Sequence, residues 1–211
     1  VRELCDKYEA LLIFDEVVSG FRWDIGGAQK YYGVTPDLCC LGKAIANGMP
    51  ISAIAGKKKY MQELNHVFFS MTFGGECLSL AAAIETIKEL KTKDYSYIWE
   101  LGNMLDKGIK EAAKKHDIKI NLVGSAPRHN LSFPTTYEDP QGMKAIFYQE
   151  MVKQGIFFPN VIYISFAHTK KDIKKTIKAA DKSFKFLKDN LNNIDSVLEG
   201  KKSIDIFRKN T

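Results

Sequence analysis

Short apolar segments dominate the first third of the chain. Four of them are runs of mostly apolar residues, at 10–16, 37–43, 51–56 and 66–73. These runs are continuous rather than alternating, which is typical of strands buried on both faces of a parallel sheet. Segments rich in Gly and Pro separate several of the runs and predict loops between them. We therefore expect an α/β arrangement in which helices cover a mostly parallel sheet.

Helical periodicity replaces these runs farther along the chain. Apolar residues recur every three or four positions over 75–91 and again from Ile98 to Ala112, which predicts two helices. The pattern then predicts, in chain order, a strand pair over 118–134 with a turn near Gly124, a helix over 142–156, a strand within 157–168 and a helix from Ile173 to Leu191. The pattern of apolar positions changes near residue 92. We therefore interpret the first part of the chain as the end of a large α/β domain and the second part as a small α+β domain.

Charge and composition exclude several classes of protein. Of the 211 residues, 45% are hydrophobic and 27% are charged, and the net charge is +6. The lysines are dispersed along helical segments, where they favour a solvated outer face over a nucleic-acid-binding patch. No apolar run approaches the roughly 18 residues of a membrane helix, and no signal peptide is visible. The cysteines form no C-x-x-C pair and the histidines have no metal-binding spacing, so we expect a cytoplasmic protein without a zinc site.

Two acidic residues and a lysine follow two of the predicted strands. Asp15 and Glu16 end the run "LLIFDE", and Lys43 follows the run "DLCCLG". Ligand-binding groups of doubly wound α/β folds lie at the carboxyl ends of parallel strands, so an acid and a lysine placed there can face one ligand. The same spacing also fits a salt bridge or solvent-exposed loop charges, and the pair alone does not separate these interpretations.

The segments around these residues carry a more specific signal. The stretch "IFDEVVSGFR", followed 28 residues after Asp15 by the Lys43 of "PDLCCLGKAIANGMP", resembles the class III pyridoxal-phosphate-dependent aminotransferases of fold type I. Further segments resemble the same family: "GGAQKYYGVTPDL", "FGGECLSLAAAIETIKEL" and "ISFAHTKKDIKKTIKAA". The resemblance extends to about residue 190, and its nearest branch contains glutamate-1-semialdehyde 2,1-aminomutase. It implies that 1–92 is the carboxyl-terminal part of the large pyridoxal-phosphate-binding domain and that 93–211 is the small carboxyl-terminal domain.

The resemblance implies a role for each of four residues. Lys43 would form the Schiff base with pyridoxal phosphate and would move a proton during the reaction. Asp15 would pair with the pyridine nitrogen and keep it protonated, so that the ring can accept electrons. Val17 would pack against the ring. Thr72 would bind the cofactor phosphate of the neighbouring subunit in a homodimer.

Three further side chains are expected to have structural roles. We expect Glu16 to form hydrogen bonds rather than to take part in a chemical step. Arg22 could bind a substrate carboxylate, but an internal ion pair is the favoured interpretation. His168 is interpreted as a packing or capping residue, with either His168 or Thr169 at the start of the last helix and Asp172 in its first turn.

The function that follows is the transfer of an amino group from a small-molecule donor to a carbonyl acceptor. Val18 stands where many class III aminotransferases carry a Gln, and an apolar residue there resembles the aminomutase branch. Glutamate-1-semialdehyde 2,1-aminomutase is therefore the alternative, and a non-catalytic binding domain on the same fold is a second one. The segment "FFPNVIYISFAHT" looks shorter than its aminomutase counterpart, so the substrate stays open.

Two parts of a pyridoxal-phosphate site are not found ahead of Asp15. Neither a Gly-rich turn for the phosphate nor an aromatic residue for the second face of the ring precedes it. Since the first residue is Val1, we expect a fragment that lacks roughly half of the enzyme. Alone, it should leave strand edges and one sheet face exposed, bind pyridoxal phosphate poorly and be inactive.

Overall fold

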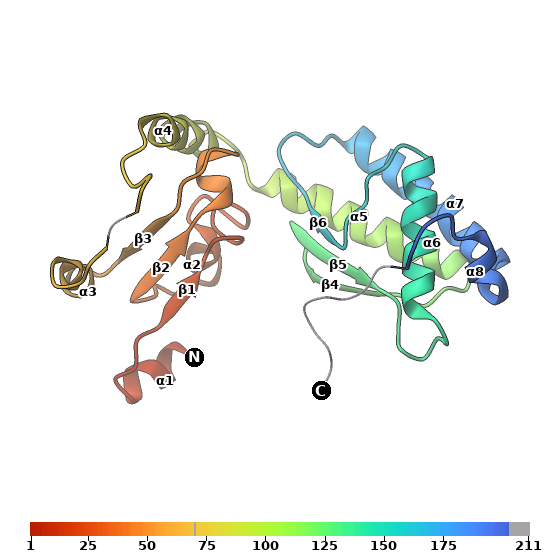
Figure 1. The fold of residues 1–211 in the computed structure, drawn as a ribbon, viewed down its shortest axis with the longest axis horizontal. Helices are drawn as coiled ribbons and strands as arrows, with labels where there is room; N and C mark the ends of the chain where they lie inside the picture. The colour runs from red at the N-terminus through yellow and green to blue at the C-terminus, as the bar shows by residue number, and fades with distance from the viewer. Residues whose placement is uncertain (70, 203–211) are drawn as a thin grey trace. The chain divides into compact units, whose positions relative to one another are not determined.

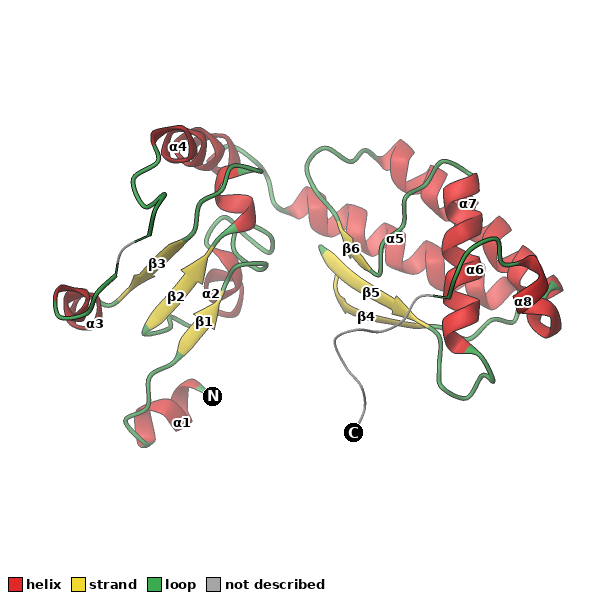
Figure 2. Ribbon diagram, viewed as in Figure 1, coloured by secondary structure: helices red, strands yellow, loops and turns green. Residues whose placement is uncertain are grey.

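The computed structural model describes residues 1–69 and 71–202, and it divides into two compact units, Val1–Tyr95 and Ser96–Thr211 (Figures 1 and 2). Each unit has a three-stranded sheet of its own, β1-β2-β3 in the first and β4-β5-β6 in the second. Ser70, within the predicted strand 66–73, lies outside the described residues, and so does 203–211, the end of the predicted second domain.

The first sheet is mixed rather than parallel. Its strands are β1 (Ile13–Asp15), β2 (Leu38–Leu41) and β3 (Ala53–Gly56). β1 and β2 are parallel, joined by a crossover that contains α2 (Gly27–Tyr32), whereas β3 is antiparallel to β2. The predicted parallel direction of 51–56 is therefore wrong. The connection from Leu41 to Ala53 has 11 residues, and a parallel crossover needs about a dozen or more.

One predicted element of the first unit is confirmed and another is wrong. The predicted helix 75–91 is α4 (Cys77–Lys91), which begins after Glu76, whose carboxylate accepts hydrogen bonds from the N–H groups of Leu78 and Ser79. The described residues of 66–73 form no strand, and the side chain of Phe68 is 96% exposed. The remaining helices of this unit are short: α1 (Arg2–Lys7), η1 (Lys43–Ala46), α3 (Lys58–Met61) and η2 (Gln62–Asn65).

Burial in the first sheet is one-sided. Leu12 and Cys39 are buried, and Ile45 and Ala46 of η1 pack against Ala83 of α4. Ile13 is 55% exposed and Ile54 is 41% exposed. The prediction of strands buried on both faces is therefore wrong for this chain, while the expected exposure of a sheet face is observed.

Asp37 ties together the amino-terminal end of the first sheet. Its carboxylate is buried and accepts hydrogen bonds from the N–H of Leu12 (2.8 Å), from Lys57 (2.7 Å) and from Arg2 (2.9 Å). These donors, the Leu12 N–H foremost, hold the pKa of Asp37 well below its usual range. The ionised carboxylate therefore stabilises the fold.

This interaction predicts a specific dependence of stability on pH. Because the pKa of Asp37 is lowered on folding, its contribution is fully present above the unfolded value of about 4 and is lost as the pH falls below it. Asp37→Asn should lower the urea midpoint at pH 7, and the difference from the wild type should shrink between about pH 5 and pH 3. A difference that stays constant from pH 7 to pH 3 would contradict this account.

Three helices cover one face of the second sheet. They are α5 (Ser96–Lys115), α6 (Pro140–Lys153) and α7 (Lys170–Asp189). The core between them and the sheet contains the fully buried side chains of Leu131, Phe147 and Phe184. The predicted apolar faces of the helices are confirmed, since Leu101, Ile109 and Leu187 are also fully buried.

The second sheet confirms the predicted strand pair but not its turn. Its strands are β4 (Asn121–Ser125), β5 (Arg128–Ser132) and β6 (Val161–Tyr163), all antiparallel. The turn is Ala126–Pro127, two residues beyond the predicted Gly124. Gly124 has φ +116°, and a Cβ there would lie 2.4 Å from the carbonyl oxygen of Arg128. Glycine is therefore required at this position because the two strands approach each other closely there, and not because it forms the turn.

The helix ends in the second unit follow local capping. The predicted helix 142–156 begins earlier, at Pro140, because Asp139 accepts a hydrogen bond from the N–H of Gly142 (2.8 Å). The last predicted helix is α7, and Thr169 is its N-cap. The hydroxyl of Thr169 accepts from the N–H of Asp172, and the Asp172 carboxylate accepts from the N–H of Thr169, which confirms the predicted cap.

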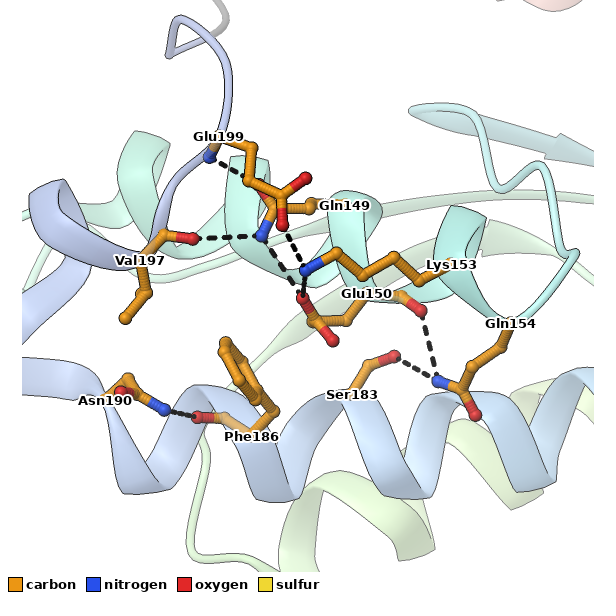
Figure 3. Close-up of polar contacts among 9 residues, drawn as sticks. All are labelled: Gln149, Glu150, Lys153, Gln154, Ser183, Phe186, Asn190, Val197 and Glu199. Carbon is orange, nitrogen blue, oxygen red and sulfur yellow. Dashed lines mark hydrogen bonds and ion pairs between the residues drawn. The ribbon is translucent and has the colours of Figure 1, made fainter.

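The segment after α7 turns back onto α6. It contains η3 (Leu191–Asn193) and α8 (Ile194–Val197). Figure 3 shows Gln149 of α6 against this segment: its Nε2 donates to the carbonyl of Val197 (3.1 Å), and its Oε1 accepts from the N–H of Glu199 (2.8 Å). Lys153 adds an ion pair with Glu199 (2.6 Å). This segment is therefore part of the fold of the second unit.

Candidate active site

Asp15 and Lys43 come to the same end of the first sheet. Asp15 is the last residue of β1, and it is the register partner of Cys40 in β2. Lys43 follows three residues after Cys40 and begins η1. Because β1 and β2 are parallel, both residues lie at carboxyl ends of neighbouring strands, the usual place for ligand-binding groups in this class of sheet. Both side chains are exposed.

One of the two oxygens of the Asp15 carboxylate accepts a hydrogen bond within the chain. This oxygen is Oδ1, which accepts from the N–H of Val17 (3.0 Å), and the bond fixes the orientation of the group. Within the described residues, no hydrogen bond involves Oδ2. The second oxygen can therefore accept a hydrogen bond from a protonated ligand nitrogen.

Lys43 has an uncommon backbone conformation. Its φ is +47°, in the left-handed region that residues other than glycine rarely adopt, and the preceding Gly42 is extended. A Cβ on Gly42 would lie 3.5 Å from Cγ1 of Val17, so the Val17 side chain lies beside the backbone that carries Lys43. Left-handed backbone of this kind costs on the order of 1–3 kcal/mol and is concentrated at functional sites.

Glu16 links β1 to α2. Its side chain is 1% exposed, and its carboxylate accepts hydrogen bonds from Ser19 Oγ (2.6 Å) and from the N–H groups of Ala28 and Gln29 (both 2.9 Å). Gly27 has φ +69°, and a Cβ there would lie 2.6 Å from the carboxylate. The predicted hydrogen-bonding role of Glu16 is therefore confirmed, and it fixes the loop that directly follows Asp15.

Removing this carboxylate should destabilise the first unit. Glu16→Ala leaves two N–H groups and a hydroxyl without their acceptor, and we expect a loss of about 2–3 kcal/mol. Hydrogen exchange of the Ala28 and Gln29 amides is the direct measurement, and it should accelerate. Glu3→Ala, which removes an exposed carboxylate from α1, is the control and should change neither amide. Unchanged exchange in Glu16→Ala would contradict the linking role.

The other predicted residues lie in separate places. Thr72 is exposed in the turn before α4. Arg22 is half-buried in the loop after β1. The Tyr95 hydroxyl donates a hydrogen bond to the carbonyl of Phe21 in the same loop (3.2 Å), and burial raises the pKa of Tyr95 to about 12. The ion pair expected for Arg22 stays a prediction. In the second unit, His168 Nδ1 accepts from the N–H of Ser165 (3.1 Å), which fits its predicted packing role.

Comparison with known proteins identifies the family. Residues 1–161 match the family described as "Aminotransferase class-III". The chain belongs to the class-III aminotransferases. "Glutamate-1-semialdehyde 2,1-aminomutase 1" of Staphylococcus carnosus is 38% identical over 199 residues, covering 87% of this chain and 46% of the relative. The protein of the same name from Staphylococcus aureus strain Newman is 39% identical over 196 residues, covering 86% and 46%. The chain thus spans about half the length of these curated relatives.

Solved structures that include transaminases have the same fold. The FumI protein of Sphingopyxis sp. MTA144, in its "PLP internal aldimine form", superposes with a TM-score of 0.83 at 28% identity, over 91% of this chain and 47% of that one. An omega-transaminase from Sphaerobacter thermophilus gives 0.81 at 22% identity, over 88% and 46%. The architecture is therefore that of a fold type I pyridoxal-phosphate enzyme, and pyridoxal phosphate is the cofactor of the family.

The residues present fit this cofactor. A carboxylate with one uncommitted oxygen can accept a hydrogen bond from a protonated pyridine nitrogen, and an exposed primary amine can react with an aldehyde. Asp15 and Lys43 supply these groups at neighbouring strand ends. Sequence reasoning missed Gly27 and Asp37, although the Gly26-Gly27 pair was a local signal that backbone approaches a side chain there.

None of the helices in residues 1–69 and 71–202 is long and apolar enough to cross a membrane.

Proposed function

We propose that this chain carries the lysine and the ring-nitrogen partner of a pyridoxal-phosphate-dependent aminotransferase. The observation that supports the proposal most is the placement of Asp15 and Lys43 at the carboxyl ends of two adjacent parallel strands. When bound, pyridoxal phosphate supplies an electron-accepting ring that stabilises negative charge on the substrate carbon. The reaction proposed is transfer of an amino group from a small-molecule donor to a carbonyl acceptor.

The residues of this chain have distinct tasks in the proposal. Lys43 Nζ would hold the cofactor covalently, and its amine would take a proton from the substrate carbon or return one to it. Asp15 keeps the ring nitrogen protonated through its negative charge. Val17 packs against the ring. Glu16 accepts hydrogen bonds from the N–H groups of α2 and so fixes the loop that connects β1 to α2. Thr72 binds the cofactor phosphate of the neighbouring subunit, so the complete enzyme is proposed to be a homodimer. Its proposed location is the cytoplasm.

The relatives span about twice the length of this chain, so the proposal concerns these residues in a complete enzyme. By "complete enzyme" we mean residues 1–211 together with the part of the fold that the match leaves uncovered. For the experiments, that part is taken either from the natural protein or from the S. carnosus relative, which gives a chimera. The turn that holds the cofactor phosphate and the second aromatic face of the ring are proposed to lie there.

A second candidate function follows from the relatives. Glutamate-1-semialdehyde 2,1-aminomutase is the name of the S. carnosus protein, and Val18 has the apolar character expected for that branch. In this alternative, the amino group moves within one five-carbon molecule rather than between two molecules.

The two candidates differ in their need for a second substrate. The complete enzyme is supplied with glutamate-1-semialdehyde in the absence of any other amino donor. Formation of 5-aminolevulinate at a steady rate supports the aminomutase, whereas turnover that requires a separate donor and acceptor supports the aminotransferase. Absence of turnover in both assays, with a panel of donors and acceptors, would contradict both.

A further inference from the structure

A buried histidine of the second unit has no part in the proposed reaction. His129 lies in β5, and its side chain is 4% exposed. Its register partners are Gly124 in β4 and Ile162 in β6, neither of which can titrate. The neutral imidazole ring has one N–H group and the charged ring has two, so the two forms differ in the acceptors that they need. The surroundings of the two ring nitrogens therefore decide which form the fold favours.

Neither ring nitrogen has a hydrogen-bond partner among the residues that the structure describes. Nδ1 is shielded from solvent without one. Nε2 lies 3.6 Å from Oδ1 of Asp106 in α5, which is beyond the usual hydrogen-bond distance. Protonation would add a second N–H group to a ring that has no acceptor for it, and a buried donor without an acceptor is destabilising. The folded unit therefore favours the neutral ring.

The charges that act on His129 come from α5 and oppose each other. The carboxylate of Asp106 favours a charged ring, but it is partly exposed and paired with Lys110 (2.8 Å), whose own charge disfavours it. Arg128, the preceding residue of β5, points to the opposite face of the sheet. Burial outweighs the attraction of Asp106 and lowers the pKa of His129.

α5 and the β4–β5 hairpin are in close contact around this ring. A Cβ on Gly102 of α5 would lie 1.9 Å from the carbonyl oxygen of Ala126, in the two-residue turn next to β5. Leu105 and Ile109, which lie near Asp106 along α5, are buried as well. Because the ring lies inside this close-packed contact, water reaches it only when the contact opens.

We propose that His129 makes the contact between α5 and β5 acid-sensitive: its imidazole takes up one proton from solvent as the contact opens, so acid favours the open state. Such a switch is separate from amino transfer and needs neither Lys43 nor the cofactor. It lies wholly within the second unit, since both α5 and β5 belong to Ser96–Thr211.

The direction and the pH range of the effect follow from linkage. The pKa of His129 is lower in the folded unit than its unfolded value of about 6.5. The stability of the second unit is therefore fully present above that value and is lost as the pH falls below it. The loss linked to Asp37 in the first unit begins only below about pH 4. The two units should thus lose stability in separate pH ranges.

Hydrogen exchange of the β5 amides in the complete enzyme, with pyridoxal phosphate bound, tests the switch. It is measured at about pH 7.5 and about pH 5.5 and corrected for the pH dependence of intrinsic exchange, which yields the equilibrium constant for opening at each pH. Between these two values, the constant should rise about 3- to 10-fold more in the wild type than in His129→Gln or His129→Phe.

Two replacements of different polarity are used because each one alters the packing at both pH values, and only the change between the two values is compared. His66→Gln, which replaces an exposed histidine of the first unit, is the control and should behave as the wild type does. If the constant rises equally, within about twofold, in the wild type and in both His129 variants, the switch is absent. A smaller rise in the wild type than in the variants would overturn it as well, because His129 would then favour the charged form.

Discussion

Replacing Lys43 with alanine in the complete enzyme is expected to lower kcat by at least about 10³-fold, because the change removes both the covalent anchor of the cofactor and the group that moves the proton. The visible absorbance that the wild type shows with pyridoxal phosphate should shift to that of the free cofactor. Far-UV circular dichroism should be unchanged, since the Lys43 side chain is exposed.

Lys58→Ala is the matched control for this prediction. Lys58 lies in α3 and is also exposed, so its replacement removes an equal charge from the same unit. We expect its kcat to stay within about twofold of the wild type, since surface substitutions away from a site rarely matter. Wild-type turnover by Lys43→Ala would contradict the role assigned to Lys43.

The largest expected effect on stability is that of Phe147→Ala. Phe147 is fully buried in the second unit and stacks on Phe184, with ring centroids 4.6 Å apart. Phe133 and Phe158 contact it edge-on, at 6.2 and 5.6 Å. Truncation removes these contacts and leaves a cavity, so the free energy of unfolding of this unit should fall by about 3–5 kcal/mol.

Hydrogen exchange of the β5 amides measures this loss, because their slowest exchange follows unfolding of the whole unit. Phe157→Ala is the control, since Phe157 is 85% exposed in the same unit. Its replacement should change the free energy of unfolding by less than about 0.5 kcal/mol. A loss below 1 kcal/mol in Phe147→Ala would show that the aromatic cluster is not the core of this unit.

The second unit was predicted well because its signals are local. The helical spacing of Ile98–Ala112 and Ile173–Leu191 identifies α5 and α7. The cap of α7 involves only the four consecutive residues Thr169–Asp172. The turn of the strand pair was misplaced because Gly124 signals a close backbone approach as well as a turn.

The first unit was predicted less well because its features depend on distant segments. The direction of β3 follows from the length of its connection, which an apolar run does not encode. The run 66–73 has the composition of a strand, yet among the described residues it pairs with no other strand. The partners of Glu16 lie 12 and 13 residues away, so its role could be inferred but not its contacts.

The position of the Asp15–Lys43 pair after two apolar runs made it a candidate, and the resemblance to the class III aminotransferases assigned the roles of its residues. Asp15 and Lys43 follow two apolar runs, and the parallel pairing of β1 and β2 brings them to one end of the sheet.

The most direct test of the central claim is a chemical label on Lys43. The complete enzyme is incubated with pyridoxal phosphate, reduced with sodium borohydride, digested and analysed by mass spectrometry. We predict a pyridoxyl group on the peptide that contains Lys43, and its absence from Lys43→Ala treated in the same way. A label on another lysine, or none at all, would contradict the account.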